Sequence, residues 1–279
     1  MQRHNWMSNF QYKSILDLVI PGSHDSFAYN MMITGPNTNN MPKLFNLFIN
    51  FWSKTQNKTI HEQLMMGIRY FDLRITKYNG NFHTIHSLIS ISLEDVLIPI
   101  IEFVKRYPTE KLILDFNHLY LEDRNEFKEY IMKRLDGLMI VNSYANRSKM
   151  LNQLDGSIFV FMSGVSNDYI ALTDDISSYW HDTNKIIQLV QDIKNEPISN
   201  DLSVCQGILT PIQSDVILGI LLFLFFPVSL QEMTDNNKNL IYTAIGESIS
   251  NKNIVIVDYV DEDFVDICLT ENYNRMLNV

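Results

Sequence analysis

Two histidines, an arginine and two aspartates occur where apolar runs of this sequence end. His24 and Asp25 follow one run, and His86 ends another. Asp72 and Arg74 are two residues apart in a third run, so a β-strand would place both on one face. An arginine that binds an anion, with one histidine as base and another as acid, suits acid–base chemistry on a phosphate ester. A buried aspartate needs a partner, so the alternative for Asp72 is a structural role beside the backbone or Arg74.

Three further polar residues share this placement. Asp115 and Asn117 lie on a common face of the run LILDFN, and Asp258 interrupts the apolar IVIVDYV. If the strands close into a barrel, the first and last strands are neighbours and Asp258 can reach His24. A metal site of His and Asp is the competing interpretation. Arg74 argues against it, because its guanidinium would fill the position of a cation. The other histidines, His4, His61, His83, His118 and His181, are expected to be structural or surface residues.

Short apolar runs alternate with amphipathic segments along the chain, which predicts a parallel sheet with helical crossovers. Eight such strands suggest a barrel whose reactive groups lie at the carboxyl ends of the strands. The link between the second and third runs is too short for a helix. We therefore expect an α/β fold, a distorted or incomplete TIM (β/α)8-type barrel. The expected strands are 16–20, 69–75, 82–86, 111–117, 138–141, 157–162, 204–209 and 253–260.

Several helices have clear boundary signals. Thr59 and Glu62 form a capping box, and Gly67 is expected to end that helix. Ser92 precedes an amphipathic stretch that ends at Tyr107 and Pro108. Further helices are expected over 123–135, 184–194 and 237–249.

The composition is that of a compact globular protein. Of the 279 residues, 46% are hydrophobic and 19% charged, and no linker or repeat divides the chain, so we expect one domain over 1–279. The net charge of −10 argues against a nucleic-acid partner. Cys205 and Cys268 are expected to be buried thiols in a reducing compartment. No secretory signal is expected at the N-terminus, and the longest apolar run, 216–228, is too short to cross a bilayer.

Four blocks of this sequence together resemble one known family, the X domain of phosphatidylinositol-specific phospholipases C. They are LDLVIPGSHDSF, QLMMGIRYFDLR, HSL and KLILDFNHLY, with weaker similarity in CQGILTP and VDYV. The chain is most similar to the small proteins that contain an X domain alone. The resemblance implies a TIM-type barrel and cleavage of phosphatidylinositol, in which the inositol 2-hydroxyl attacks the phosphorus. The implied products are diacylglycerol and inositol 1,2-cyclic phosphate, so the implied class is a phosphodiesterase with lyase chemistry.

The resemblance also implies a role for each matching residue. His24 is the base that deprotonates the hydroxyl, and Asp258 orients it and stabilises its cationic form. His86 is the acid that protonates the leaving glycerol oxygen, with Asp25 as its partner. Arg74 binds the phosphate and stabilises the transition state.

Two residues are implied to bind substrate. Asp72 holds Arg74 or the inositol in place, and Asn117 stands about where the bacterial secreted enzymes carry a basic residue, so headgroup preference stays open. The animal signalling enzymes bind calcium with carboxylates where Arg74 stands. The resemblance therefore implies the metal-independent branch, with no metal and no cofactor.

The implied partner is phosphatidylinositol in membranes, reached through peripheral contact from the cytoplasm; the oligomeric state is not predicted. Apolar residues at the barrel mouth are the candidates for this contact: Phe45, Phe48, Phe51 and Trp52, or 221–226, with a packed helix as the alternative. Two other functions stay open. One is a catalytically inactive phosphoinositide-binding module, and the other is a metal-dependent glycerophosphodiesterase.

Overall fold

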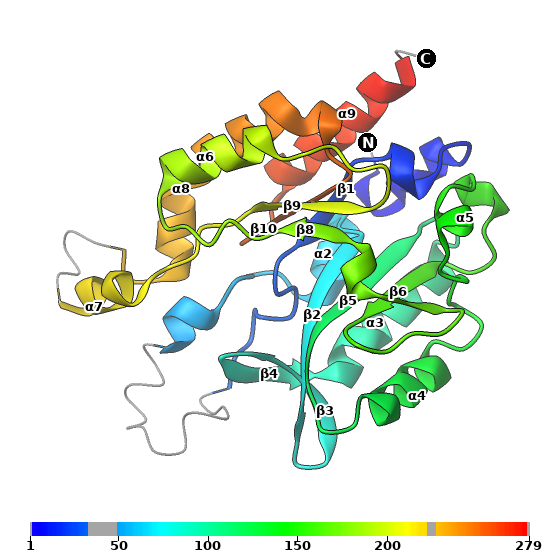
Figure 1. The fold of residues 1–279 in the computed structure, drawn as a ribbon, viewed down its shortest axis with the longest axis horizontal. Coiled ribbons are helices and arrows are strands. Elements are labelled where there is room, and N and C mark those ends of the chain that lie inside the picture. Colours follow the sequence, from blue (N-terminus) through cyan, green and yellow to red (C-terminus); the bar gives the residue numbers. More distant parts are fainter. Residues whose placement is uncertain (1, 33–48, 222–226, 278–279) are drawn as a thin grey trace.

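The computed structural model describes residues 2–32, 49–221 and 227–277. Eight strands follow one another in the order β7-β6-β5-β2-β1-β10-β9-β8, and every pairing along this path is parallel (Figure 1). Within the described residues, no strand pairing joins β7 to β8, so the barrel is open there. This confirms the expected incomplete TIM-type barrel. The strands are β1 (Ile20–Ser23), β2 (Tyr70–Tyr78), β5 (Leu112–Tyr120), β6 (Ile158–Met162), β7 (Ile170–Leu172), β8 (Ser177–Tyr179), β9 (Ser203–Gly207) and β10 (Ile254–Val257).

An antiparallel ribbon extends from β2 and carries one of the expected site residues. β3 (Asn81–His86) pairs with β2, and β4 (Leu88–Ser92) pairs with β3. Asn79 and Gly80 both have positive φ, 49° and 80°, which is the conformation that a two-residue hairpin turn requires. The run 82–86 is therefore a ribbon strand rather than a strand of the barrel path, and it brings His86 to the barrel mouth.

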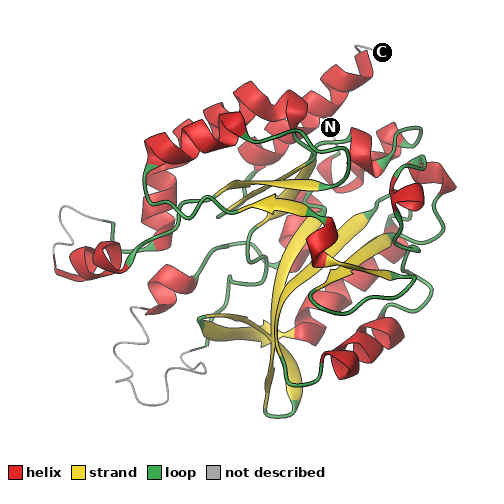
Figure 2. Ribbon diagram, in the orientation of Figure 1, coloured by secondary structure: helices red, strands yellow, loops and turns green. Residues whose placement is uncertain are grey.

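The helices lie outside the sheet (Figure 2). α6 and α8 contact β9, and α9 contacts β1. The expected caps are confirmed: Thr59 and Glu62 form the capping box of α2, Gly67 ends it at φ 118°, and Ser92 caps α3. The helices are α2 (Ile60–Met66), α3 (Leu93–Arg106), α4 (Arg124–Arg134), α5 (Tyr144–Arg147), α6 (Ile186–Asn195), α7 (Gln213–Leu221), α8 (Leu230–Ser248) and α9 (Glu262–Leu277). Short 3₁₀ helices are η1 (Arg3–Phe10), η2 (Ile15–Asp17), η3 (Leu151–Gln153), η4 (Thr173–Asp175) and η5 (Ile249–Asn251).

Several expected strands differ from the structure. The segment 138–141 forms one isolated bridge, Met139 to Ile158, and no strand. The first strand begins at Ile20, because 15–17 is the 3₁₀ helix η2. It continues through Gly22, where an added Cβ would lie 2.8 Å from Ile256 and 2.9 Å from Tyr70. Strands β4, β7 and β8 were not expected from the sequence. β7 and β8 have three residues each, too few to show a pattern.

A buried ion pair holds the amino-terminal ends of β2 and β5 together. Arg69 Nη2 lies 2.6 Å from Glu110 Oε2, and both side chains are fully buried. The guanidinium also donates to the carbonyls of Leu64 and His4. Because His4 belongs to η1, this pair fastens the N-terminal segment to the end of the barrel opposite the site.

Candidate active site

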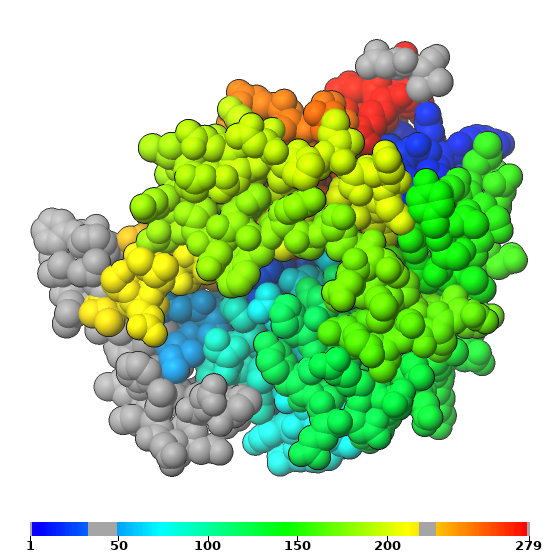
Figure 3. Space-filling model, in the orientation of Figure 1, coloured from blue at the N-terminus to red at the C-terminus, as the bar shows by residue number. Residues whose placement is uncertain are grey.

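A cavity of about 780 Å³ opens at the carboxyl ends of the strands. Figure 3 shows the surface hollowed where the segment around 170–215 faces the segment around 50–120. The side chains that line the cavity come from both halves of the barrel, including His24, Arg74, His86 and Asp258. The residues that the sequence placed at separate strand ends therefore share one cavity.

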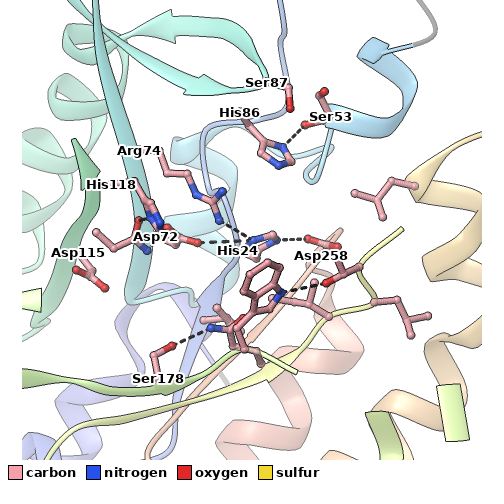
Figure 4. A pocket seen from close by; sticks show the side chains of 18 of the residues that line it. His24, Ser53, Asp72, Arg74, His86, Ser87, Asp115, His118, Ser178 and Asp258 are labelled. Atoms are coloured by element: carbon pink, nitrogen blue, oxygen red, sulfur yellow. Dashed lines mark hydrogen bonds and ion pairs between the residues drawn. The ribbon is translucent and has the colours of Figure 1, made fainter. Parts of the chain in front are cut away.

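His24 and Asp258 are in direct contact because β1 and β10 are neighbours in the sheet. His24 Nδ1 donates to Asp258 Oδ1 at 2.8 Å (Figure 4). This bond holds a proton on Nδ1, so Nε2 is the atom that can gain or lose one. The other carboxylate oxygen of Asp258, Oδ2, is buried and has no hydrogen-bond partner among the residues that the structure describes.

Asp25 lies at the centre of the site. Its Oδ1 is 2.7 Å from Arg74 Nε, and its Oδ2 is 3.3 Å from His24 Nε2 and 3.4 Å from His86 Nε2. These are ion-pair distances without hydrogen-bond alignment, and the carboxylate is fully buried. Burial opposes its charge, but Arg74 and then the two histidines lower the pKa of Asp25 below its ordinary value. Its backbone has a φ of 38°, a strained conformation for Asp that the surrounding turn maintains.

His86 is fixed from its other side. Its Nδ1 donates to the carbonyl of Ser53 at 2.7 Å, so its Nε2 faces Asp25 (Figure 4). The rings of His24 and His86 have centroids 6.2 Å apart. The two Nε2 atoms thus approach the same carboxylate oxygen from two strands.

The proton on His24 decides which neighbour its Nε2 contacts. Burial disfavours the charged ring, but Asp25, Asp258 and Asp72 outweigh it and raise the pKa of His24 to about 9. In the charged ring, Nε2–H faces Asp25. In the neutral ring, Nε2 accepts from Arg74 Nη2, which lies 3.2 Å away. Without substrate, Arg74 Nη2 is therefore the donor to Nε2 of the neutral ring.

Asp72 and Asn117 support Asp25 through a chain of hydrogen bonds. Asp72 Oδ2 accepts the backbone N–H of Asp25 at 3.1 Å, and its Oδ1 accepts from Asn117 Nδ2 at 2.6 Å. Asn117 Oδ1 in turn accepts from His118 Nδ1 at 2.8 Å. His118 is exposed, as expected, and it also lines the cavity, which the sequence did not predict. It reaches the cavity because β5 continues past Asn117 to Tyr120.

Asp115 lies deeper on the same strand. Tyr70 Oη donates to its Oδ2 at 2.7 Å, and Thr173 Oγ1 donates to its Oδ1. Burial, together with Asp72 and Asp174, raises the pKa of Asp115 to about 7 against these two hydrogen bonds. Other polar residues line the same cavity: Ser163, Thr173, Asp174, Ser178, Gln206 and Thr210. Its apolar lining residues are Ile49, Trp52, Ile176, Ile208, Leu209, Pro211, Val216, Leu230 and Ile256.

One group of side chains has the spacing of a metal site. Ligand atoms of His24, Asp25 and Asp72 lie within 4.8 Å of one another. The guanidinium of Arg74 is 2.7 Å from Asp25 and 3.2 Å from His24, so a fixed cation already neutralises this group. A divalent ion bound there would have to displace Arg74.

The apolar candidates for membrane contact divide into three groups. Phe51 is 54% exposed, whereas Trp52 is only 8% exposed and forms part of the cavity wall, so the expectation for Trp52 is wrong. Phe45, Phe48 and 222–226 lie outside the described residues. Trp180, which the sequence did not single out, lines the cavity and is 63% exposed. Among the described helices, none has the length and apolar character needed to span a bilayer.

The fold and the site define an incomplete α/β barrel with an arginine, two histidines and their carboxylates gathered at the strand ends. Residues 46–161 match the family model described as phosphatidylinositol-specific phospholipase C, X domain. Over these residues the chain is therefore similar to the PI-PLC X domain family.

Curated relatives extend this result. The mouse PI-PLC X domain-containing protein 3 is 26% identical over 293 residues, covering 93% of this chain and 89% of the relative. The human PI-PLC X domain-containing protein 2 is 38% identical over 130 residues, 42% of this chain and 43% of the relative. A Dictyostelium discoideum PI-PLC X-box domain-containing protein is 27% identical over 230 residues, 73% of this chain and 31% of the relative. The chain therefore spans less than half the length of the human and Dictyostelium relatives, and 89% of the length of the mouse relative.

Solved structures show the same fold. The phosphatidylinositol-specific phospholipase C from Listeria monocytogenes has a TM-score of 0.68 and 20% identity, covering 98% of this chain and 99% of that one. A phosphatidylinositol-specific phospholipase C from Staphylococcus aureus has a TM-score of 0.72 and 18% identity, covering 96% and 97%.

Proposed function

We propose that the chain is a phosphatidylinositol phosphodiesterase of the phospholipase C type, acting at the cytoplasmic surface of membranes. It would release diacylglycerol and leave inositol 1,2-cyclic phosphate. One observation carries the proposal: His24, Arg74 and His86 line one cavity, and each lies within 3.4 Å of the buried carboxylate of Asp25. This set contains a base, an acid and an anion-binding group, which are the parts that transfer at a phosphodiester requires.

The first role belongs to His24. Its neutral ring takes the proton of the inositol 2-hydroxyl at Nε2 while Asp258 holds Nδ1–H at 2.8 Å. The hydroxyl oxygen forms a bond to phosphorus as the proton leaves. Asp258 then stabilises the imidazolium that results, in the manner of the aspartate of a catalytic triad.

His86 and Arg74 complete the step. His86 in its protonated form gives the proton on Nε2 to the glycerol oxygen as the bond from phosphorus to that oxygen breaks. Arg74 stabilises the negative charge on the phosphoryl oxygens. Both Nε2 atoms approach one oxygen of Asp25, so base and acid lie on either side of one carboxylate. Asp72 and Asn117 hold the centre in place through the Asp25 backbone.

The mixed lining of the cavity supports a lipid substrate with a polyol headgroup. Hydroxyl, amide and carboxyl side chains such as Thr173, Gln206 and Asp115 line it together with aliphatic side chains such as Ile208 and Leu209. A polyol phosphate joined to diacylglycerol has matching polar and apolar parts. The exposed Phe51, Trp180 and Ile217 are the described residues that we propose to enter the membrane interface.

The test is turnover of phosphatidylinositol in mixed micelles containing EDTA, with His24→Ala and His86→Ala as variants. Each variant is expected to lose about 10²- to 10⁴-fold in kcat, the usual contribution of a general acid or base. His61→Ala is the matched control, because His61 is exposed on α2 and absent from the cavity wall.

Two outcomes would replace the proposal. Vesicle binding without turnover by the parent would indicate a phosphoinositide-binding module. Activity that EDTA abolishes would indicate a metal-dependent phosphodiesterase.

A further inference from the structure

Residues 53–56 are hydrogen-bonded to the chain around both His24 and His86. At the start of this segment, the carbonyl of Ser53 accepts from His86 Nδ1 at 2.7 Å (Figure 4). At its end, Gln56 Nε2 donates to the carbonyl of His24 at 2.9 Å. Ser53 is 3% exposed and Gln56 is fully buried. One buried segment therefore connects the proposed acid to the proposed base.

The amide of Gln56 joins the chain after β1 to the chain after β10. Its Nε2 also donates to the carbonyl of Val257 at 3.1 Å, and its Oε1 accepts the backbone N–H of Val260 at 3.1 Å. Asp258 lies in the turn between these two valines. The carbonyl of Val257 accepts the N–H of His24 as well, at 3.2 Å. Gln56 thus fixes the turn of Asp258 relative to His24, and the two side chains meet at 2.8 Å.

Thr55 contacts the same two turns through its own side chain and backbone. Its Oγ1 donates to the carbonyl of Asp25 at 3.0 Å and lies 3.3 Å from the carbonyl of His24. The carbonyl of Thr55 accepts the N–H of Tyr259 at 2.7 Å. Asp25 and Tyr259 have positive φ, 38° and 50°, and such strain persists only where neighbouring groups maintain it. Thr55 therefore helps to maintain both strained turns.

We propose that Thr55 and Gln56 are positioning residues, which hold the two histidines of the site in the orientation that proton transfer needs. Neither is among the described residues that line the cavity, so each acts through the backbone and not through a substrate. A reacting group that is misplaced by about 1 Å can slow a reaction about 100-fold. This inference rests on the proposed function and adds to it two residues outside the cavity.

The first experiment compares Gln56→Met with Asn272→Leu, because each replaces a buried amide with an apolar side chain of similar size. In Gln56→Met the carbonyls of His24 and Val257 each keep another donor, so the fold is expected to persist. Asn272 is the matched control. It is 1% exposed, and its amide both donates to and accepts from the backbone of Val19, just before β1 and at the end opposite the site.

The two variants are expected to differ in turnover of phosphatidylinositol and not in folding. In Gln56→Met, kcat is expected to fall about 10- to 100-fold while KM changes less than about threefold. Asn272→Leu is expected to lose at least as much stability in urea unfolding, because it leaves two backbone groups without partners, yet to keep kcat within about threefold of the parent. Equal losses of kcat in the two variants would overturn the inference.

A second pair of variants tests the hydroxyl of Thr55. Thr55→Val keeps the branched shape and removes the donor, whereas Thr55→Ser keeps the donor and removes a methyl group. Thr55→Val is expected to lower kcat about tenfold, and Thr55→Ser to retain most of the parent activity. Lower activity in Thr55→Ser than in Thr55→Val would show that packing and not the hydrogen bond matters, and would overturn the role of Thr55.

NMR titration of the His24 ring tests the inference without turnover. The charged and titratable groups that face this ring are Asp25, Asp72, Arg74, His86 and Asp258. Burial opposes the charge of His24, but Asp25 and then Asp258 raise its pKa to about 9. This pKa is expected to fall by about 0.5 pH unit or more in Gln56→Met, because the turn that carries Asp258 is no longer held, and to stay unchanged in Asn272→Leu.

The titration also separates this inference from the proposed function. An unchanged His24 pKa in Gln56→Met would refute the positioning role, whatever the lipid assay shows. Absence of turnover by a parent protein whose His24 pKa does respond to Gln56→Met would refute the proposed function alone.

Discussion

Replacing Asp258 with asparagine separates the charge of this residue from its hydrogen bond. Asparagine keeps an oxygen that can accept from His24 Nδ1, which Asp258 contacts at 2.8 Å. The rise of the His24 pKa from 6.5 to about 9 corresponds to about 3 kcal/mol in favour of the charged ring. Asp258 is one of three carboxylates that cause this rise against burial. Its loss is expected to lower the pKa of His24 by about one to two pH units.

The assay is the pH dependence of kcat/KM for phosphatidylinositol between about pH 6 and 10. The parent is expected to gain activity as pH rises through about 9, because His24 must be neutral to accept the proton. In Asp258→Asn this rise in activity is expected to occur about one to two pH units lower. Plateau kcat is expected to fall about 10²- to 10⁴-fold, because the imidazolium formed in the reaction loses its counter-charge. Asp263→Asn is the control, because Asp263 is an exposed residue of α9, and it is expected to leave the pH dependence unchanged.

NMR titration of the His24 ring protons checks the same shift without turnover. A ring that titrates near 6.5 in the parent would contradict the effect of the carboxylates on the pKa of His24. A pKa that is unchanged in Asp258→Asn would contradict the contribution of Asp258. Stability supplies a third readout. Because the folded pKa lies above the unfolded one, His24 stabilises the parent fully below about pH 6.5, and this contribution is lost as pH rises through about 9. The variant is expected to show a smaller loss over that interval.

Three further predictions concern other parts of the molecule. Arg74→Lys is expected to lower kcat about 10²- to 10³-fold, because an ammonium cannot contact Asp25 and a phosphate in the geometry of a guanidinium; a change under threefold in the same assay would contradict this. Glu110→Gln leaves Arg69 buried and unpaired, and is expected to cost about 3–5 kcal/mol in urea unfolding; a cost below about 1 kcal/mol would contradict it. Phe51→Ala is expected to weaken binding to vesicles containing phosphatidylinositol about tenfold. An equal loss in Ile187→Ala, which removes another exposed apolar side chain, would argue against a specific contact.

The sequence predicted the barrel well wherever a strand was long and bounded by a clear turn. Segments 69–75, 111–117 and 157–162 correspond to β2, β5 and β6 with boundaries shifted by up to three residues. It failed where tertiary pairing rather than composition decides the structure. The apolar 138–141 finds one bridge partner instead of a ladder, and three-residue β7 and β8 exist only because β6 and β9 pair with them.

The sequence predicted that the site residues lie together at the carboxyl ends of the strands. His24, Asp72, Arg74, Asp258 and their neighbours meet in one cavity because parallel strands end at the same edge. The contacts themselves were not predictable. The central position of Asp25 depends on its positive φ, and the orientation of His86 depends on a carbonyl 33 residues away. The place of His118 in the cavity follows from the extra length of β5.

Phosphorus NMR of the products most directly tests the central claim that His24 and His86 perform cyclising transfer at a phosphodiester. Phosphatidylinositol would be incubated with the protein in EDTA, and the spectrum followed over time. The account predicts that the resonance of inositol 1,2-cyclic phosphate appears first and is absent with His24→Ala. Formation of inositol 1-phosphate without a cyclic intermediate would contradict cyclising transfer by His24 and His86. That claim would also be contradicted if the folded protein bound the lipid and formed no product.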